Sequence, residues 1–363
     1  MKAFAFFCLL IIGGMGINAQ TVVDNMFPNV VISREHYDFM LKDLKENPET
    51  AFPSQWYYSR VKKTADDLLS SGWNASPVVS VDDNPDKVDI SAEMEKIYLL
   101  CLTFAFEQDN RYLDKAVESL KAWAAVNKPL SKRNIHEECY NNGVEGYSII
   151  RKVIDASDRN IIDGWVRKRA DQFVSDNDIR INNWTTCLMH QFFLYGKVLE
   201  DEDVYNMYKN QYGGWVKNNL FPNGTTTDLL GRDAFAYHAY DLMFFGRIAH
   251  LIALYEGYDA ADRFYTQDID LGASVKKSVD FWKPFCLNPD KYTHVEFVET
   301  EYEPDKNRND YNKTYSPSGT LYAMDPLYEF DQSLDEVFNK YGRNPMNAHL
   351  DFGISYLRWY YEK

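Results

Sequence analysis

The stretch Thr227-Asp-Leu-Leu-Gly-Arg-Asp-Ala-Phe-Ala-Tyr-His-Ala-Tyr-Asp-Leu242 follows a loop rich in Gly, Asn and Thr and opens a long apolar helix. At this junction of loop and helix the sequence gathers Arg232, Tyr237, His238 and Tyr240. Residues five apart on one helix are offset by roughly 140°. We therefore expect Arg232 and Tyr237 to converge only if Arg232 still lies in the loop, with Asp228 or Asp233 as the helix cap.

This group of side chains has a chemical interpretation and a structural one. A cation beside a phenol and an imidazole can neutralise an acid group, move a proton and favour the ionised form of the phenol. An amphipathic helix with a hydrogen-bonded histidine and a surface arginine would show the same residues, because burying aromatic rings is ordinary. The stretch alone leaves both interpretations open.

Helical patterns continue on both sides of this stretch, with almost no strand signal and no break in composition. They cover residues 35–46, 55–71, 91–109, 113–126, 136–156, 158–174, 184–199, 204–220, 227–255, 273–285, 326–341 and 350–361. This succession predicts an all-α fold in one domain, with antiparallel helix pairs closing into an (α/α) toroid, an incomplete barrel around a cleft. An open superhelical array of helix pairs is the alternative.

Residues 292–325 interrupt the helical pattern with a charged, turn-rich segment. A loop of this length inside a compact domain is usually functional or mobile. It either forms a lid that carries Lys306, Arg308, Lys313 and Tyr315 to a substrate, or it is a solvated connection.

Two further motifs stand on either side of the central stretch. Asn182-Asn183-Trp184 precedes an apolar helix, and His294-Val-Glu-Phe-Val298 is followed by Pro304-Asp-Lys306 and Arg308. Together the three patches, which span roughly residues 180–330, resemble the alginate lyase family. The members of that family are helical-toroid polysaccharide lyases that cut uronate-containing glycans.

The resemblance implies roles for individual residues. It makes Tyr237 the catalytic acid, and in many members also the base, while Asn183 helps to neutralise the substrate carboxylate and Arg232 assists. Well-known members carry a histidine where this chain has Trp184, so the role of base does not transfer to that position. The rival bases are His238 and His190, which lies two turns after Asn183 and thus on nearly the same helix face. For substrate binding the candidates are Asn182, Trp184, Tyr240, His294, Tyr140, Asn142 and Lys313.

The implied function is a secreted polysaccharide lyase that cleaves alginate or a related uronate polymer by β-elimination. A toroid glycoside hydrolase is one alternative, because Asp228, Asp233, Glu299 and Glu301 offer carboxylates for the pair that hydrolysis requires. A non-catalytic glycan-binding protein of the envelope is another.

The charge and composition of the 363-residue chain narrow its partners. A formal net charge of −15 argues against nucleic acid, whose binding depends on Lys and Arg at the phosphates. The expected partner is an acidic polysaccharide, which requires a local cationic patch. Candidates for that patch are Arg60, Arg232, Lys306, Arg308 and Lys313. Aromatic residues make up 15% of the chain, and they serve either sugar stacking or core packing.

Residues 1–19 have the features of a signal peptide, with Lys2, an apolar run and a small-residue exit before Gln20. They predict a mature chain of 20–363 in the periplasm or outside the cell. No other run approaches the roughly 20 apolar residues of a membrane span. The remaining cysteines lack metal-ligand spacing, so no metal site is expected. We also expect no cofactor and no disulfide framework.

Overall fold

The computed structural model describes residues 19–47, 51–78, 89–176, 180–267 and 272–362, and the side chains of residues 213–217 lie outside the description. The predicted signal peptide falls almost entirely on residues 1–18, which are outside the described residues. The α-helices are α1 (Ala19–Asn25), α2 (Arg34–Glu46), α3 (Ser54–Trp56), α4 (Lys63–Leu68), α5 (Ile90–Glu107), α6 (Asn110–Val126), α7 (Asn141–Ile150), α8 (Ala156–Ser175), α9 (Asn183–Leu199), α10 (Glu202–Asn219), α11 (Thr227–Arg232), α12 (Phe235–Glu256), α13 (Tyr258–Thr266), α14 (Val275–Leu287), α15 (Asp335–Lys340) and α16 (Leu350–Tyr361).

Short helical turns complete the chain, and one of them is a π-helical segment between α3 and α4. They are η1 (Tyr57–Lys62, the π-helix), η2 (Ile135–Tyr140), η3 (Glu303–Asn307), η4 (Pro317–Gly319), η5 (Leu321–Met324) and η6 (Gln332–Leu334). Within the described residues the only β-pairing consists of two isolated bridges, Leu220–Thr226 and Val295–Thr314.

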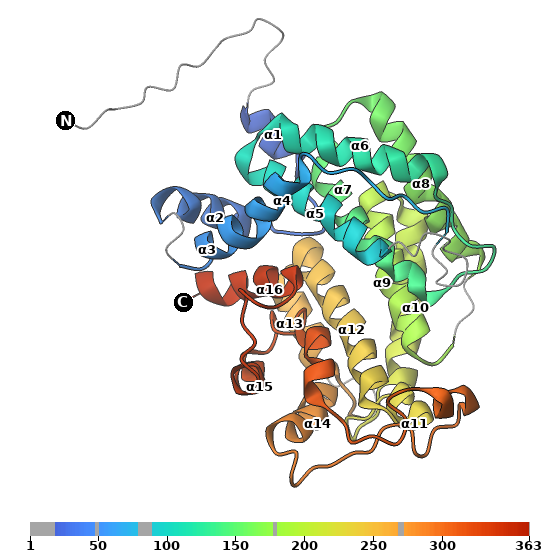
Figure 1. The fold of residues 1–363 in the computed structure, drawn as a ribbon. Helices are drawn as coiled ribbons and strands as arrows, with labels where there is room; N and C mark the ends of the chain where they lie inside the picture. The colour runs from blue at the N-terminus through green and yellow to red at the C-terminus, as the bar shows by residue number, and fades with distance from the viewer. Residues whose placement is uncertain (1–18, 48–50, 79–88, 177–179, 268–271, 363) are drawn as a thin grey trace, which may run out of the picture.

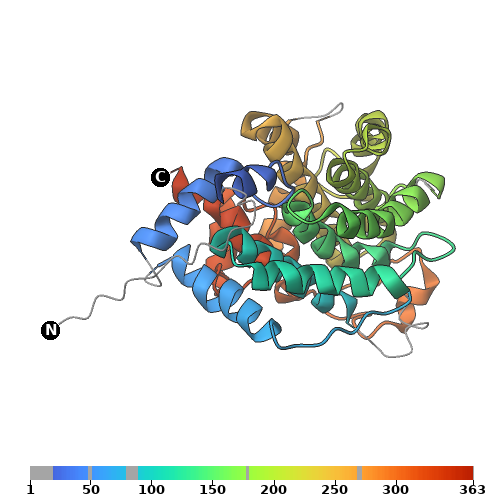
Figure 2. The same cartoon turned by 90° about the horizontal axis from the view of Figure 1, so that it is seen from above.

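The long helices form two layers, as Figures 1 and 2 show. In the inner row α5 packs against α7, α7 against α9, and α9 against α12. In the outer row α6 packs against α8 and α8 against α10, and each outer helix also contacts an inner one. This arrangement is the (α/α) toroid that the sequence predicts.

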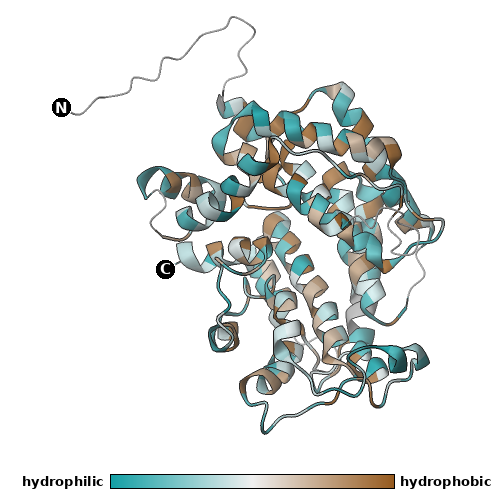
Figure 3. Ribbon diagram, in the orientation of Figure 1, coloured by the Kyte–Doolittle hydropathy of each residue, from teal (hydrophilic) through white to brown (hydrophobic). Residues whose placement is uncertain are grey.

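Residue patterns explain which helices are inner and which are outer. Almost every residue of α9 is buried, and most of α12 is buried as well, because a helix that is apolar all round belongs inside. In α6 the buried residues are Tyr112, Ala116, Ser119, Leu120 and Trp123, a single stripe at helical spacing. Figure 3 shows the alternation of hydrophobic and hydrophilic residues along α6 that such a stripe produces.

The two ends of the described chain meet. Helix α16 packs against α2, and the Tyr361 hydroxyl donates to Asp43 at 2.9 Å. Figure 1 shows the first helices beside the last one. Arg60 takes part in this closure, because its guanidinium donates to the Met346 carbonyl at 3.1 Å. That use places Arg60 in the frame of the fold rather than in a cationic substrate patch.

Most large rings fill the core. Trp56, Trp123, Trp165 and Trp282 are fully buried, so core packing accounts for half of the eight tryptophans. Cys101, Cys187 and Cys286 are buried free thiols, and Cys139 is a half-buried one. None of the described helices is long and apolar enough to cross a membrane.

The helix predicted over 227–255 is in fact two helices. The first, α11, is capped by Thr226, whose side chain accepts from the Leu229 N–H, so neither Asp228 nor Asp233 is the cap. The second, α12, begins at Phe235 without a side-chain cap. Helix α13 was not predicted, and residues 326–331 form turns ahead of η6 and α15.

Candidate active site

The break between α11 and α12 brings Arg232 and Tyr237 together. Asp233 adopts a left-handed conformation (φ 49°) and donates its N–H to Leu229 O at 2.8 Å, which ends α11. The chain then turns into α12, so the 140° offset of a continuous helix does not apply. Arg232 Nη2 donates to the Tyr237 hydroxyl at 2.8 Å, and the guanidinium lies 3.9 Å from the centre of the Tyr237 ring.

The segment after residue 292 is held against this break by its backbone. The Phe297 N–H donates to Asp233 O at 2.7 Å, and the Glu301 N–H donates to Gly231 O at 3.0 Å. The Glu299 N–H donates to the Asp233 carboxylate at 2.7 Å. The late segment, with no helical period in its sequence, is therefore built onto the same junction as Arg232 and Tyr237.

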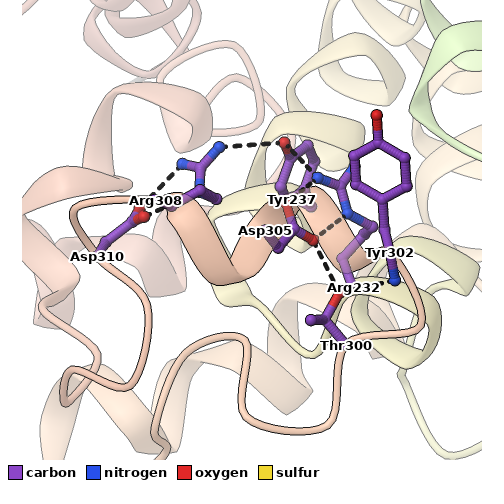
Figure 4. Close-up of polar contacts among 7 residues, drawn as sticks. All are labelled: Arg232, Tyr237, Thr300, Tyr302, Asp305, Arg308 and Asp310. Carbon is purple, nitrogen blue, oxygen red and sulfur yellow. Dashed lines mark hydrogen bonds and ion pairs between the residues drawn. The ribbon is translucent and has the colours of Figure 1, made fainter.

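The buried carboxylate of Asp305, on η3, binds Arg232 through Nε and through Nη2, the nitrogen that also donates to the phenol. Arg232 Nε donates to Asp305 Oδ2 at 2.6 Å and Nη2 donates to Oδ1, a bidentate pair (Figure 4). Thr300 Oγ1 donates to the same carboxylate at 2.8 Å. The half-exposed ring of Tyr302 covers the guanidinium at 4.7 Å. The forked face of Arg232 is thus already occupied by a carboxylate of the protein.

A second arginine reaches the same phenol. Arg308 Nη1 donates to the Tyr237 hydroxyl at 3.3 Å, while its other nitrogens pair with Asp310 at 2.8 and 2.9 Å (Figure 4). Two guanidiniums therefore meet at one phenolic oxygen, and Tyr237 is only half-buried. Positive charge on both sides stabilises negative charge that develops on this oxygen.

Asn183 lies at the same end of the toroid, linked to α11 through a buried carboxylate. It is the first residue of α9, which Asn182 caps by accepting from the Trp184 N–H at 3.1 Å. The Asn183 N–H donates to Asp228 Oδ2 at 2.6 Å, and Asp228 stands one turn before Arg232 on α11. Asn183 itself is 2% exposed, so it is buried at the start of α9.

The structure does not support either candidate histidine as the catalytic base, because both lie in the interior. His238 is fully buried, with Nδ1 3.1 Å from Thr226 Oγ1 and Nε2 3.1 Å from Ser278 O. Burial lowers the pKa of His238 to about 4. His190 is 1% exposed, its Nδ1 lies 3.4 Å from Asn141 Nδ2, and burial lowers its pKa well below the ordinary value. Each ring supports the core, and neither faces Tyr237.

The prediction that Tyr140 binds the substrate is also wrong, because the structure buries this residue completely. Its hydroxyl accepts from Asn127 at 2.8 Å, and the Arg169 guanidinium lies 3.9 Å from its ring centre. The sequence predicts Tyr140 as a substrate-binding residue. The aromatic ring instead fills the space between the inner and outer helices.

The remaining candidates are partly accessible. Trp184 is half-buried with the Arg180 and Arg133 guanidiniums at 4.6 and 5.7 Å from its ring. His294 Nε2 lies 3.0 Å from Asp233 O, so it braces the late segment. Lys313 shares an open surface with Arg308. Asn142 and Tyr240 are half-buried and line a separate cavity.

Comparisons with known proteins place the chain in a family. The sequence model of the alginate lyase family matches residues 42–292. The chain belongs to this family. It is accordingly a polysaccharide lyase, which sets aside the hydrolase and the non-catalytic alternatives. No curated protein matches it in sequence.

Solved structures of alginate lyases share its fold at low identity. The enzyme from Bacteroides ovatus is 14% identical with a TM-score of 0.64, over 90% of this chain and 99% of that one. Alginate lyase A1-III from Sphingomonas species A1 is 15% identical with a TM-score of 0.59, over 89% and 93%. A histidine-to-alanine variant of A1-III in complex with a tetrasaccharide is 16% identical with a TM-score of 0.57, over 77% and 82%.

Sequence reasoning did not single out Asp305, the partner of Arg232. It predicted Arg308 as part of a cationic patch but did not predict that Arg308 contacts Tyr237. The only available signal was the Pro304-Asp-Lys306 motif in a segment crowded with charges, where no periodicity distinguishes one carboxylate from the next.

Proposed function

We propose that this lyase is exported and cleaves alginate or a related uronate polymer by β-elimination at Tyr237. The observation that carries the proposal is the convergence of Arg232 and Arg308 on the phenolic oxygen of the half-buried Tyr237. The tetrasaccharide bound to the A1-III variant supports a polysaccharide as substrate. Export is inferred from the signal-peptide features of residues 1–19.

In the proposed reaction Tyr237 serves as both base and acid. The phenolic oxygen, with its charge stabilised by two guanidiniums, takes the C5 proton of the uronate. The C5 electron pair forms the C4–C5 double bond as the C4–O4 bond breaks. The phenol then returns its proton to the departing O4. No second base is required, in keeping with the interior positions of His190 and His238.

Neutralisation of the substrate carboxylate is assigned to Asn183 and Arg308 rather than to Arg232. Asp305 already occupies both forked nitrogens of Arg232, so that guanidinium acts on the phenol. Arg308 pairs with the half-exposed Asp310, and a surface ion pair of this kind exchanges partners at little cost. Asn183 offers a carboxamide at the N-terminus of α9, the end of the toroid that also carries α11 and Arg232.

Replacement of the phenol tests the proposal. We expect Tyr237→Phe to lower kcat on a uronate polymer by at least about 100-fold, since general acid–base catalysis contributes this much. The readout is the ultraviolet absorbance of the unsaturated product, with circular dichroism to confirm the fold.

Tyr360→Phe is the matched control, because it removes a phenolic hydroxyl from exposed α16 and is expected to leave the rate unchanged. Full activity in Tyr237→Phe would refute the assignment of Tyr237. Cleavage of polymer without the chromophore would refute elimination itself.

A further inference from the structure

A second cavity lies on the inner face of the toroid, separate from the Arg232–Tyr237–Arg308 group. Its volume is about 360 Å³, and it is enclosed by α5, η2, α7, α12 and the start of α16. Three carboxyl groups, three phenols and a carboxamide are among the side chains that line it: Glu95, Glu138, Asp351, Tyr98, Tyr240, Tyr322 and Asn142.

Helix α12 connects this cavity to the proposed catalytic tyrosine. Tyr240 follows Tyr237 by three residues, and Arg247, also in the lining, follows Tyr240 by seven. Residues at these spacings share one helix face. At a rise of about 1.5 Å per residue the lining begins roughly 5 Å beyond Tyr237 along the axis. A polymer cut at Tyr237 that continues along this face therefore places a neighbouring sugar in the cavity.

The charge of the cavity is the opposite of what a uronate needs. Arg247 is its one guanidinium among the lining residues, and it pairs with Asp351 at 3.1 Å and with Glu138 at 3.7 Å. Three carboxyls against one arginine leave the lining acidic. Burial raises the pKa of Glu95 and of Glu138, because negative charge is already costly in this cavity. A further anion beside them is unfavourable.

The lining nevertheless has features of a sugar site. Tyr322, 38% exposed, stands at the rim with the ring of His349 at 6.2 Å, and flat rings suit the faces of sugars. The Nη1 nitrogen of Arg247 is buried and lies 3.7 Å from a Glu138 carboxylate oxygen, too far for a hydrogen bond, so its hydrogen-bonding capacity is unused among the described residues. Its donor suits a hydroxyl oxygen, and the carboxylates accept from hydroxyl or ammonium groups. The described residues include no group of three ligands placed to hold a metal ion.

We propose that this cavity is a subsite for a sugar without an acidic group, either a neutral sugar or an amino sugar, next to the uronate that is cleaved. The inference rests on the proposed function and narrows its substrate class. Among the substrates of the proposed function, the subsite favours a related polymer in which uronate alternates with such a sugar over alginate, in which every sugar is a uronate.

Binding and cleavage test the subsite separately. The cleavage substrates are polymannuronate, a polymer of uronate alternating with neutral hexose, and one of uronate alternating with amino sugar. The binding probes are uncharged hexose, amino-sugar and uronate tetrasaccharides, measured by calorimetry on the full chain. We expect the wild type to cleave an alternating polymer with a kcat/KM about tenfold or more above that for polymannuronate. We also expect it to bind a tetrasaccharide without carboxylates about tenfold or more tightly than the uronate tetrasaccharide. The better of the two alternating polymers identifies the sugar.

Glu95→Gln removes one lining charge at nearly constant shape. We expect it to reduce the discrimination against polymannuronate and the uronate tetrasaccharide several-fold. Glu118→Gln makes the same change of charge on the outer helix α6, where Glu118 pairs with Lys115, and should alter nothing. Tyr322→Ala, at the exposed rim, should weaken binding of the uncharged tetrasaccharide even if Glu95→Gln folds poorly.

The subsite is refuted if uronate and uncharged tetrasaccharides bind equally to the wild type, or if neither Glu95→Gln nor Tyr322→Ala changes binding. That result would leave elimination at Tyr237 intact. Absence of cleavage on every polymer would count against the proposed function alone, because the calorimetric preference still decides the subsite.

Discussion

At the scale of single residues, the pair formed by Arg232 and Asp305 sets the geometry around Tyr237. Arg232 is enclosed by the Tyr237 ring, the Tyr302 ring and the buried carboxylate of Asp305. Such a guanidinium has little freedom to turn toward a substrate. Its position therefore fixes the direction from which positive charge reaches the phenol.

Replacing Asp305 by asparagine tests this interpretation. We expect Asp305→Asn to lower kcat by about 10- to 100-fold with a smaller change in KM, because Arg232 loses its anchor and the phenol its alignment. The free energy of unfolding should fall by about 2 kcal/mol, since Asp305 is 2% exposed and Arg232 24% exposed. Steady-state kinetics and urea denaturation measure the two effects.

Asp310→Asn provides the comparison, because Asp310 pairs with Arg308 at a half-exposed site. Its stability effect should stay below about 1 kcal/mol. Equal effects of the two substitutions on stability would contradict a special role for the buried pair.

Sequence patterns could not decide which of the candidate bases are accessible. The motifs predicted that Tyr237 and Asn183 belong to one site, and residue type alone made both histidines plausible bases. Burial decided against His190 and His238, and burial depends on which helix face meets the core. A chain pattern cannot distinguish the two faces of α9 or α12, because both helices are apolar all round.

At the scale of helices, the long amphipathic and apolar patterns predicted most elements, while the breaks between them were harder to place. The Gly/Thr loop ahead of residue 227 predicted a helix start, yet the second start at Phe235 has no capping side chain that marks it. It depends instead on Glu296, whose carboxylate accepts from the Phe235 N–H at 3.2 Å. A cap supplied from 61 residues away leaves no local signal.

The packing of α12 against the segment after η5 gives a test at this scale. A Cβ atom on Gly246 would lie 2.9 Å from Leu327 Cγ, 3.0 Å from Leu327 N and 3.1 Å from Pro326 C. Because two of these atoms are backbone, they cannot move aside alone. We expect Gly246→Ala to lower the free energy of unfolding by about 1–3 kcal/mol, measured by thermal and urea denaturation.

Gly164→Ala is the matched substitution on outer helix α8, where a Cβ atom would meet nothing within 4 Å. It should raise stability by about 0.5–1 kcal/mol, the usual difference between alanine and glycine inside a helix. A stabilising Gly246→Ala would show that α12 and the segment after η5 are not closely packed.

At the scale of the whole molecule, the fold buries several carboxyl groups, and one pair, Asp228 and Asp241, joins four helices, α9, α10, α11 and α12. Asp241 on α12 accepts from Thr186 Oγ1 on α9 and from Asn219 Nδ2 on α10, the latter at 2.7 Å. Asp228 accepts from the Asn183 N–H and has no cation as a close partner among the described residues. Burial, followed by the charge of Asp241, raises the pKa of Asp228 well above its ordinary value.

This pair makes stability depend on pH in a defined direction. A carboxyl whose pKa is higher in the folded state than the unfolded value of about 3.9 holds its proton more tightly when folded. Its stabilising contribution is complete below pH 4 and is lost as the pH rises toward the folded pKa, by up to about 1.4 kcal/mol per pH unit.

Asp228→Asn carries no proton to lose, and its amide oxygen can still accept from the Asn183 N–H. We therefore expect the variant to lose less stability than the wild type between pH 5 and pH 8, with urea denaturation at each pH as the measurement. Asp171→Asn on the exposed face of α8 should follow the wild-type curve. Parallel curves for Asp228→Asn and the wild type would mean that Asp228 is ionised in the folded protein and that its charge is compensated within the helices around Asn183.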